Sequence, residues 1–181
     1  MTFTYSSDEN DYLQHTLYIA SKSDRVKNER RKGRFLITIL FLGLSFILFK
    51  AKDELGMYLF LSAAVLSFLL YPAYLKRYYL KHYRKNVADI YKNRFNKSTT
   101  ITFKETTIDV TDITGEMKIN FSIIQEIVET GNYFYLRINT GGSLIISKTK
   151  IENPGDLALF LKALAGKLNI NYTEELNWEW K

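Results

Sequence analysis

Residues 35–49 read FLITILFLGLSFILF, and residues 55–75 read LGMYLFLSAAVLSFLLYPAYL. Neither run contains an ionisable Asp, Glu, Lys, Arg or His, and twelve of the fifteen residues in the first run are Phe, Leu or Ile. A helix that crosses a bilayer needs about 20 apolar residues. The second run has this length, and the first reaches it if Arg34 and Lys50 extend their side chains toward the headgroups. The two runs therefore predict a pair of membrane-spanning helices.

The alternative interpretation is a helical hairpin buried in the core of a soluble protein. A core helix of that kind normally keeps one polar face, whereas no face of either run carries a charge. We therefore favour the membrane. The link at residues 50–54 is short, so the two helices are expected to be antiparallel neighbours in a hairpin over residues 35–75.

Basic residues are concentrated around the two runs. Residues 22–97 contain 17 Lys and Arg but only five Asp and Glu, and both the segment before them and the segment after them are net acidic. Seven of the basic residues lie within 22–34, eight lie within 76–97, and the link has two. Because Lys and Arg gather on the cytoplasmic side of spans, we expect a multi-pass protein of the cell (inner) membrane with both termini in the cytoplasm.

Basic and aromatic side chains next to the spans are candidates for contact with the membrane surface. Lys and Arg are attracted to anionic lipids by about 1 kcal/mol each, and aromatic rings are enriched at the interface. The basic candidates are Arg30, Arg31, Lys32, Arg34, Lys76, Arg77, Lys81, Arg84 and Lys85. The aromatic candidates are Tyr71, Tyr74, Tyr78 and Tyr79. Such a mixture also suits nucleic acid, but the membrane topology already accounts for it.

The segments outside the spans predict an α+β fold. Residues 2–5 alternate like a short strand, and Ser7 is the expected N-cap of a following helix, on whose surface we expect His15. From residue 99 the apolar period is two, with turn signals at intervals, which predicts about six short antiparallel strands. Asn153 and Pro154 predict the start of a helix over residues 154–168. Its apolar stripe would cover an open side of a bent sheet or barrel.

These patterns divide the chain into five segments. They are an N-terminal cytoplasmic strand and helix (1–34), the transmembrane hairpin (35–75, with spans 35–49 and 55–75), a basic juxtamembrane helix (76–98), a cytoplasmic domain (99–171) and a tail (172–181). The expected fold class is thus a two-helix transmembrane hairpin plus a small antiparallel β-barrel or sheet capped by one C-terminal helix. The tail alternates Leu176, Trp178 and Trp180, which fits one more strand, an interfacial anchor or a partner-binding tail.

No pattern in the chain predicts catalysis. There is no cysteine, there are only two histidines, and neither a phosphate-binding glycine loop nor a nucleophile motif is present. Glu126 and Glu129 fall in one predicted strand and would point to opposite faces. The spans also lack the ionisable groups of an ion pathway. We therefore expect no enzymatic activity, no catalytic residues, no cofactor and no metal.

The layout resembles the YcxB-like family of small bacterial membrane proteins. The resemblance is carried by residues 3–6, 11–13, the basic run up to Arg34, and residues 101–103, 121–124 and 144–148. It departs from the family at Phe121, where tryptophan is common, and at Ser147, where a proline often precedes the lysine. The resemblance implies two membrane spans and a cytoplasmic pleckstrin-homology-like barrel, capped by the helix at 154–168. A full barrel of that type has seven strands, so residues 2–5 are a candidate for the seventh. No established activity is implied.

Three functions are compatible with these expectations. The leading one is a membrane-anchored interaction module that presents its pleckstrin-homology-like domain to a protein partner or lipid headgroups. The second is an accessory or assembly subunit acting through its hairpin, where Gly43, Ser45 and residues 62–64 allow close helix packing. The third is nucleic-acid binding through residues 76–97. The expected partners are membrane lipids and an unidentified protein, with a second copy of the chain as an alternative.

Overall fold

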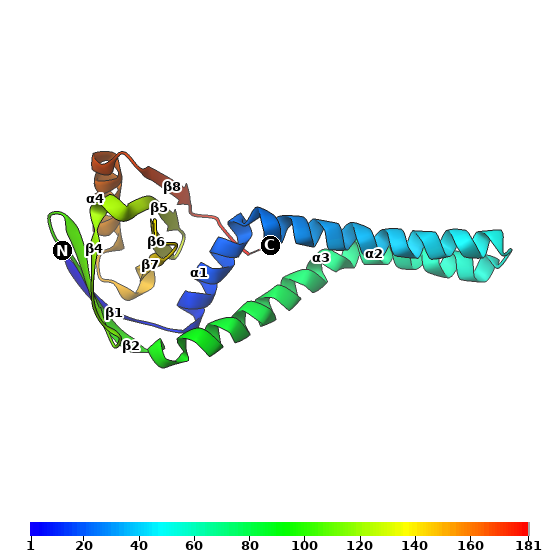
Figure 1. The fold of residues 1–181 in the computed structure, drawn as a ribbon, viewed down its shortest axis with the longest axis horizontal. Helices are drawn as coiled ribbons and strands as arrows, with labels where there is room; N and C mark the ends of the chain where they lie inside the picture. Colours follow the sequence, from blue (N-terminus) through cyan, green and yellow to red (C-terminus); the bar gives the residue numbers. More distant parts are fainter. Residues whose placement is uncertain (181) are drawn as a thin grey trace. The chain divides into compact units, whose positions relative to one another are not determined.

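The computed structural model describes residues 1–180, which form two compact units. The sheet unit comprises residues 1–16 and 86–179, and the helical unit comprises residues 17–85 together with Trp180. Figure 1 shows the strands in the first unit and the long helices in the second. The expected α+β class with long apolar helices is therefore confirmed.

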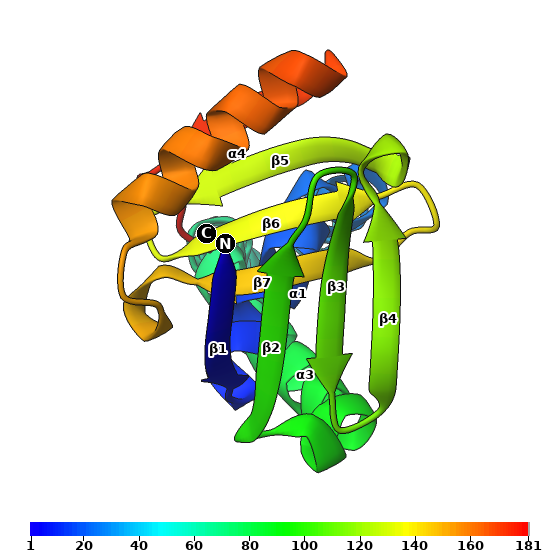
Figure 2. The same cartoon turned by 90° about the vertical axis from the view of Figure 1, so that its left-hand side faces the viewer.

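The first sheet of the sheet unit has four antiparallel strands in the order β1-β2-β3-β4. Their bounds are β1 (Thr2–Ser7), β2 (Lys97–Phe103), β3 (Thr107–Asp112) and β4 (Gly115–Asn120). β1 comes from the N-terminus and pairs with β2, with Thr2 opposite Thr102. Figure 2 shows β1 at the outer side of this sheet. The strand expected at residues 2–5 is thus confirmed.

The second sheet also has four strands, in the order β7-β6-β5-β8. The strands β5 (Ile124–Thr130), β6 (Tyr133–Ile138) and β7 (Ser143–Ser147) are antiparallel, and β8 (Asn171–Glu175) runs parallel to β5. α4 (Pro154–Leu168) connects β7 to β8, and Asn169 ends it with a left-handed φ of 53°, a conformation that Asn tolerates well. The helix expected at 154–168 is confirmed.

The core of the sheet unit lies between the two sheets and under α4. Ile101 and Ile108 from the first sheet, Ile127 and Leu136 from the second, and Leu161 from α4 all have 0% exposure. Burying each such side chain stabilises the fold by about 1.5–3 kcal/mol. The alternating apolar side chains after residue 99 and the apolar stripe of α4 therefore pack into the same core.

Of the expected barrel or sheet, the sheet form is present, while closure into a barrel and purely antiparallel pairing are wrong. The strands form two separate sheets and do not close into a barrel. The arrangement is also not purely antiparallel, because β8 pairs with β5 in parallel. Alternation identifies the strands, but the pairing partner of each strand depends on where its connection runs. Here α4 carries the chain back so that β8 enters beside β5 in the same direction.

The expected N-cap of the first helix is also wrong. α1 (Glu9–Lys22) follows Asp8, and Ser7 still belongs to β1. The Asp11 backbone N–H donates to Asp8 Oδ1 over 3.0 Å, and the Asp8 N–H donates to Asp11 Oδ2 over 2.8 Å. This reciprocal pair is a capping box. Asp8 therefore starts the helix, one residue later than predicted.

The helical unit contains the predicted hairpin. α2 (Asp24–Lys50) and α3 (Glu54–Tyr91) lie side by side, and Pro72 is inside α3 without ending it. Only 6% of the most apolar window of each helix is buried; Leu36, for example, is 68% exposed and Leu55 is 83% exposed. Both helices are long and apolar enough to cross a membrane, and within this chain they are not the buried core of the soluble alternative.

Candidate functional site

Arg34 directly precedes the apolar run of α2 and connects α2 to α3. Its Nε donates to the backbone oxygen of Phe68 over 3.0 Å, and its guanidinium carbon is 3.7 Å from the centre of the Phe68 ring. Phe68 lies four residues before Pro72, whose nitrogen has no hydrogen to donate to that carbonyl. Arg34 therefore supplies the hydrogen bond that the proline leaves out.

The small residues of the runs have different surroundings. The Ser45 hydroxyl donates to the backbone oxygen of Met57 over 2.9 Å, and Ser45 and Ala64 are buried. Gly43 is exposed, and a methyl group in place of its hydrogen would meet no atom within 4 Å. Ser45 and Ala64 thus serve the packing of this chain's own hairpin, whereas Gly43 is on an open face.

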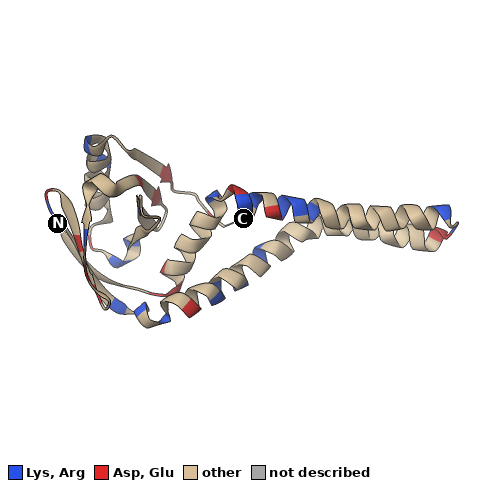
Figure 3. Ribbon diagram, in the orientation of Figure 1, with Lys and Arg blue, Asp and Glu red and all other residues tan. Residues whose placement is uncertain are grey.

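The predicted basic membrane-surface residues lie on α2 and α3, outside the uncharged middle of the hairpin (Figure 3), whereas Tyr71 and Tyr74 lie within the second uncharged run. The basic ones are Arg30, Arg31, Lys32 and Arg34 on α2, and Lys76, Arg77, Lys81, Arg84 and Lys85 on α3. Tyr71, Tyr74 and Tyr78 form a ladder with 6.3 Å between the centres of successive rings, and Tyr78 meets Tyr79 edge-on at 5.7 Å. Their contact with lipid stays a prediction.

A shallow groove runs along α2 at the boundary between its basic and apolar parts. Its volume is about 430 Å³, and it is lined by Arg31, Lys32, Phe35, Leu36 and Ile39. All five side chains are exposed. The groove therefore places two cations at one end of a hydrocarbon surface.

Trp180, in the predicted tail, packs inside the helical unit. Its ring centre is 6.5 Å from that of Tyr79 and 6.2 Å from that of Tyr83, and the Arg30 guanidinium lies 5.2 Å from the ring. Only 8% of Trp180 is exposed. The alternation of the tail did not predict this contact, because β8 ends at Glu175 and the partners of Trp180 are distant in sequence.

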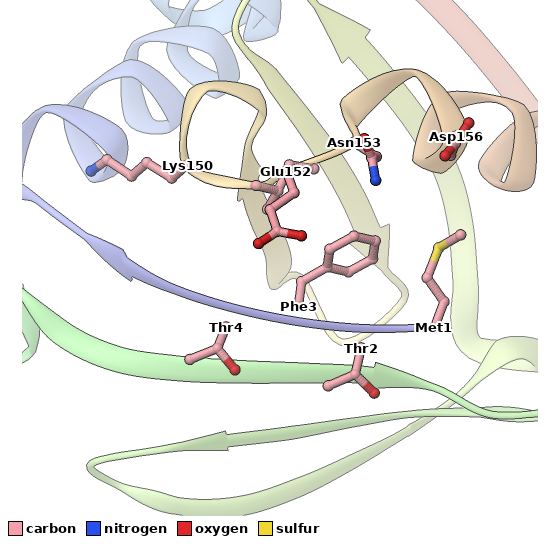
Figure 4. Close-up of a pocket in the computed structure, with 9 residues that line it drawn as sticks. Met1, Thr2, Phe3, Thr4, Lys150, Glu152, Asn153 and Asp156 are labelled. Atoms are coloured by element: carbon pink, nitrogen blue, oxygen red, sulfur yellow. The ribbon is translucent and has the colours of Figure 1, made fainter.

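A cavity of about 420 Å³ lies in the sheet unit, between β1 and the segment that joins β7 to α4. It is lined by Met1, Thr2, Phe3, Thr4, Lys150, Ile151, Glu152, Asn153 and Asp156. Figure 4 shows Phe3 and Glu152 pointing into this space, while Lys150 points away from it. Sequence reasoning missed this site, because only the pairing of β1 with β2 brings the N-terminus near residues 150–156.

Lys150 holds one wall of the cavity in place. Its Nζ lies 2.7 Å from Asp8 Oδ2 and 2.6 Å from Asp11 Oδ2, so the 3₁₀ turn Lys148–Lys150 is tied to the junction of β1 and α1. Burial by itself raises the pKa of Asp8, but the hydrogen bonds from Lys150 and from backbone N–H groups outweigh it, and the pKa lies below its ordinary value. The same two carboxylates outweigh burial at Lys150 and raise its pKa.

Glu126 and Glu129 bind different partners, as their predicted orientation on opposite faces of one strand implies. Glu126 Oε2 accepts from Arg137 over 2.9 Å, and Glu129 Oε1 accepts from Lys148 over 2.7 Å. Tyr172 of β8 donates to the other oxygen of Glu129. Both acids therefore secure neighbouring strands to β5. Within residues 1–180, no group of three or more His, Cys, Asp or Glu side chains could hold a metal ion.

His15 is not the surface histidine that we expected. It packs against β6, which is buried on both faces. Phe134 and Leu136 of β6 belong to the core between the sheets, while Tyr133 and Tyr135 lie on its other face, outside that core. The His15 ring is 5.1 Å from that of Tyr135, and its Nε2 is buried without a hydrogen-bond partner among the described residues. Burial, with a further contribution from Arg137, lowers the pKa of His15 to about 4.

Residues 103–164 match a family model described as YcxB-like protein. The match begins at the last residue of β2 and ends within α4, so it includes the cavity residues from Lys150 to Asp156. No curated protein and no solved structure matches the chain. The family resemblance expected from the sequence is therefore confirmed over these residues.

Proposed function

We propose that this protein is a membrane-anchored interaction module. α2 and α3 cross the cell (inner) membrane as a hairpin with both termini in the cytoplasm, and the sheet unit binds a protein partner there. The observation that carries the proposal is the contrast between the two units: the sheet unit buries its apolar side chains, whereas the apolar windows of α2 and α3 are 6% buried. Two sheets with a C-terminal helix, together with the family match, support a relationship of the sheet unit to pleckstrin-homology-like domains.

The energetics favour lipid around the hairpin. Soluble monomers rarely expose apolar patches beyond a few hundred Å². Each Leu, Ile, Phe or Val at the centre of a span favours insertion by about 0.3–0.6 kcal/mol, and residues 35–49 alone contain twelve Leu, Ile or Phe. Thr38, Gly43 and Ser45 offset only part of this gain.

The absence of cysteine makes the topology directly testable. We expect the protein to stay in membranes washed with alkaline carbonate. In whole cells, an impermeant maleimide should label Lys52→Cys, in the link, but should label Glu116→Cys, on exposed β4, only after the membrane is opened. Recovery of the protein in the soluble fraction, or labelling of both variants in intact cells, would contradict the proposal.

The exposed Gly43 favours a second function, that of a subunit which assembles through its hairpin. Close helix packing in membranes uses small residues, and Gly43 is a small residue that this chain's own packing does not use. Under this alternative, Gly43→Leu abolishes a crosslinked complex in membranes, whereas Leu42→Ala at a neighbouring exposed position leaves it intact. An unchanged pattern of crosslinked species in Gly43→Leu would exclude it.

The groove on α2 favours lipid headgroups as an additional ligand of the module, since its two cations adjoin apolar surface. The double substitution Arg31→Gln with Lys32→Gln should then weaken retention of phosphatidylglycerol in detergent more than Lys76→Gln with Arg77→Gln, which removes the same charge outside the groove. Equal effects of the two pairs would indicate only a general attraction between basic residues and anionic lipid.

Nucleic-acid binding through residues 76–97 stays a prediction, to be tested by the salt dependence of binding.

A further inference from the structure

β1 is an edge strand, because it stands last in its sheet and pairs only with β2. The N-terminal ammonium group of Met1 donates to the Phe103 oxygen over 3.4 Å, and the Phe103 N–H donates to the Met1 oxygen over 2.9 Å. In an antiparallel ladder such exchange recurs at every second residue. Phe3 therefore points its N–H and C=O toward β2, and Thr2 and Thr4 point theirs away from it.

The outward backbone groups of Thr2 and Thr4 border the cavity of about 420 Å³. An unpaired strand edge is a template for another strand, which would lie about 4.8 Å from β1. The stretch from Met1 to Thr4 is roughly 10 Å long at 3.3 Å per residue. An extended segment of another chain could therefore pair with three or four residues of the β1 edge and lie in the cavity beside them.

The wall opposite β1 is acidic. Glu152 and Asp156 have no ion-pair partner within residues 1–180, whereas the ammonium group of Lys150 is held by two aspartates and points away. Asp156 is in the first turn of α4, where the helix dipole favours a carboxylate. Glu152 has no comparable local role, and Figure 4 shows it directed toward β1. Phe3 and Ile151 add apolar surface.

We propose that this cavity binds an extended segment of a partner protein, which adds to β1 as a further strand and places a Lys or Arg side chain against Glu152 and Asp156. This inference rests on the proposed function in that it names the kind of partner that the module recognises. Backbone hydrogen bonds to Thr2 and Thr4 supply affinity, and the acidic wall together with Phe3 selects the side chains.

Other occupants fit the cavity less well. A second copy of the chain could pair edge to edge, but its own β1, TFTYSS, carries no basic residue for Glu152 and Asp156. An anionic lipid headgroup would meet the carboxylates of Glu152 and Asp156, while the ammonium group of Lys150 is already held by two aspartates. The acidic wall therefore favours a basic protein segment.

The test uses the full-length protein in detergent and a phage-displayed library of random twelve-residue peptides. We expect the enriched peptides to contain Lys or Arg within an alternating pattern. Their affinity should fall roughly tenfold or more in the variant Glu152→Gln with Asp156→Asn, since a charged hydrogen bond is lost. The control variant Glu105→Gln with Glu116→Gln removes two negative charges outside the cavity and should bind normally.

A second measurement distinguishes strand addition from simple charge attraction. Methylation of backbone nitrogens, one at a time along an enriched peptide, should abolish binding at alternate positions, because only every second N–H faces β1. Thr4→Pro should abolish binding too, since it removes an outward N–H and leaves the ladder with β2 intact. Failure to enrich peptides, equal binding by the Glu152 and Asp156 variant, or methylation effects without a period of two would overturn the proposal. None of these results depends on whether the hairpin enters a membrane, so membrane fractionation tests the anchor separately.

Discussion

At the scale of single residues, burial gives His15 a measurable property. Its ring is held against Tyr135, and the pKa of His15 is lowered to about 4 by this burial. In the unfolded chain the pKa is about 6.5. Between these two values the unfolded chain binds a proton that the folded protein does not bind. The free energy of unfolding therefore falls as the pH decreases from about 6.5 toward 4.

Between pH 7 and pH 4.5, the free energy of unfolding of His15→Phe should fall by about 1–3 kcal/mol less than that of the wild type. Urea unfolding of the full-length protein in detergent at the two pH values measures it. Gln14→Ala, at the neighbour of His15 on α1 that carries no titratable group, is the control and should keep the wild-type dependence. If His15→Phe loses as much stability as the wild type on acidification, the assigned environment of His15 is wrong.

The ion pairs of Lys150 predict a second effect at this scale. Lys150→Met leaves Asp11, whose side chain is 3% exposed, without its cation. The free energy of unfolding should therefore fall by about 2–4 kcal/mol near neutral pH.

The same substitution should change the response to acid. The pKa of Asp8 is lowered in the folded protein, so the ion pair of Asp8 contributes to stability above about pH 4, and this contribution is lost as the pH falls through the folded pKa. The variant should therefore show a weaker loss of stability below pH 4. Lys118→Met, on exposed β4, should change neither quantity, and equal behaviour of the two variants would contradict the role given to Lys150.

At the scale of elements, local signals in the sequence predicted the helices and strands better than their partners. Asn153 and Pro154 mark the start of α4, and the alternation of Ile101 and Phe103 with Thr marks β2. The parallel pairing of β8 and the division into two sheets have no local signal, because they depend on the path of the chain through α4. The contact of Arg34 with Phe68 was missed for a similar reason, although Pro72 did mark a carbonyl that would need another donor.

That contact predicts a rescue between the two long helices. Arg34→Met should destabilise the hairpin by about 1–2 kcal/mol, because the Phe68 carbonyl loses its donor. In a protein that already carries Pro72→Ala, the new backbone N–H can bond to that carbonyl, so the same change at Arg34 should cost less. A double-mutant cycle by denaturant unfolding in detergent measures the difference. Additive costs would show that Arg34 does not replace the bond missing at Pro72.

At the scale of the whole molecule, the sheet unit is assembled from two distant parts of the sequence. β1 and the start of α1 precede the helical unit, whereas every other strand follows it. The cavity, the ion pairs of Lys150 and the environment of His15 all join these two parts. A sequence pattern read along the chain finds each part alone, and this is why it missed the candidate site while it found the hairpin, whose two helices are adjacent in sequence.

This assembly predicts how fragments behave. Residues 86–179 alone lack β1, so β2 becomes an exposed edge and the core loses Tyr5, which donates a hydrogen bond to the backbone of β7. We expect this fragment to aggregate or unfold below about 40 °C, since mesophilic domains cluster at 45–65 °C even when intact. A chain in which residues 1–16 are joined to residue 86 by a flexible glycine–serine linker should unfold cooperatively at least 10 °C higher, because each 1 kcal/mol moves the midpoint of such a domain by about 4–8 °C. Thermal unfolding followed by circular dichroism compares the two. Equal midpoint temperatures of the two chains would mean that the N-terminal residues contribute nothing to the stability of the sheet unit. The proposed strand-binding cavity would then be contradicted too, because β1 forms one of its walls.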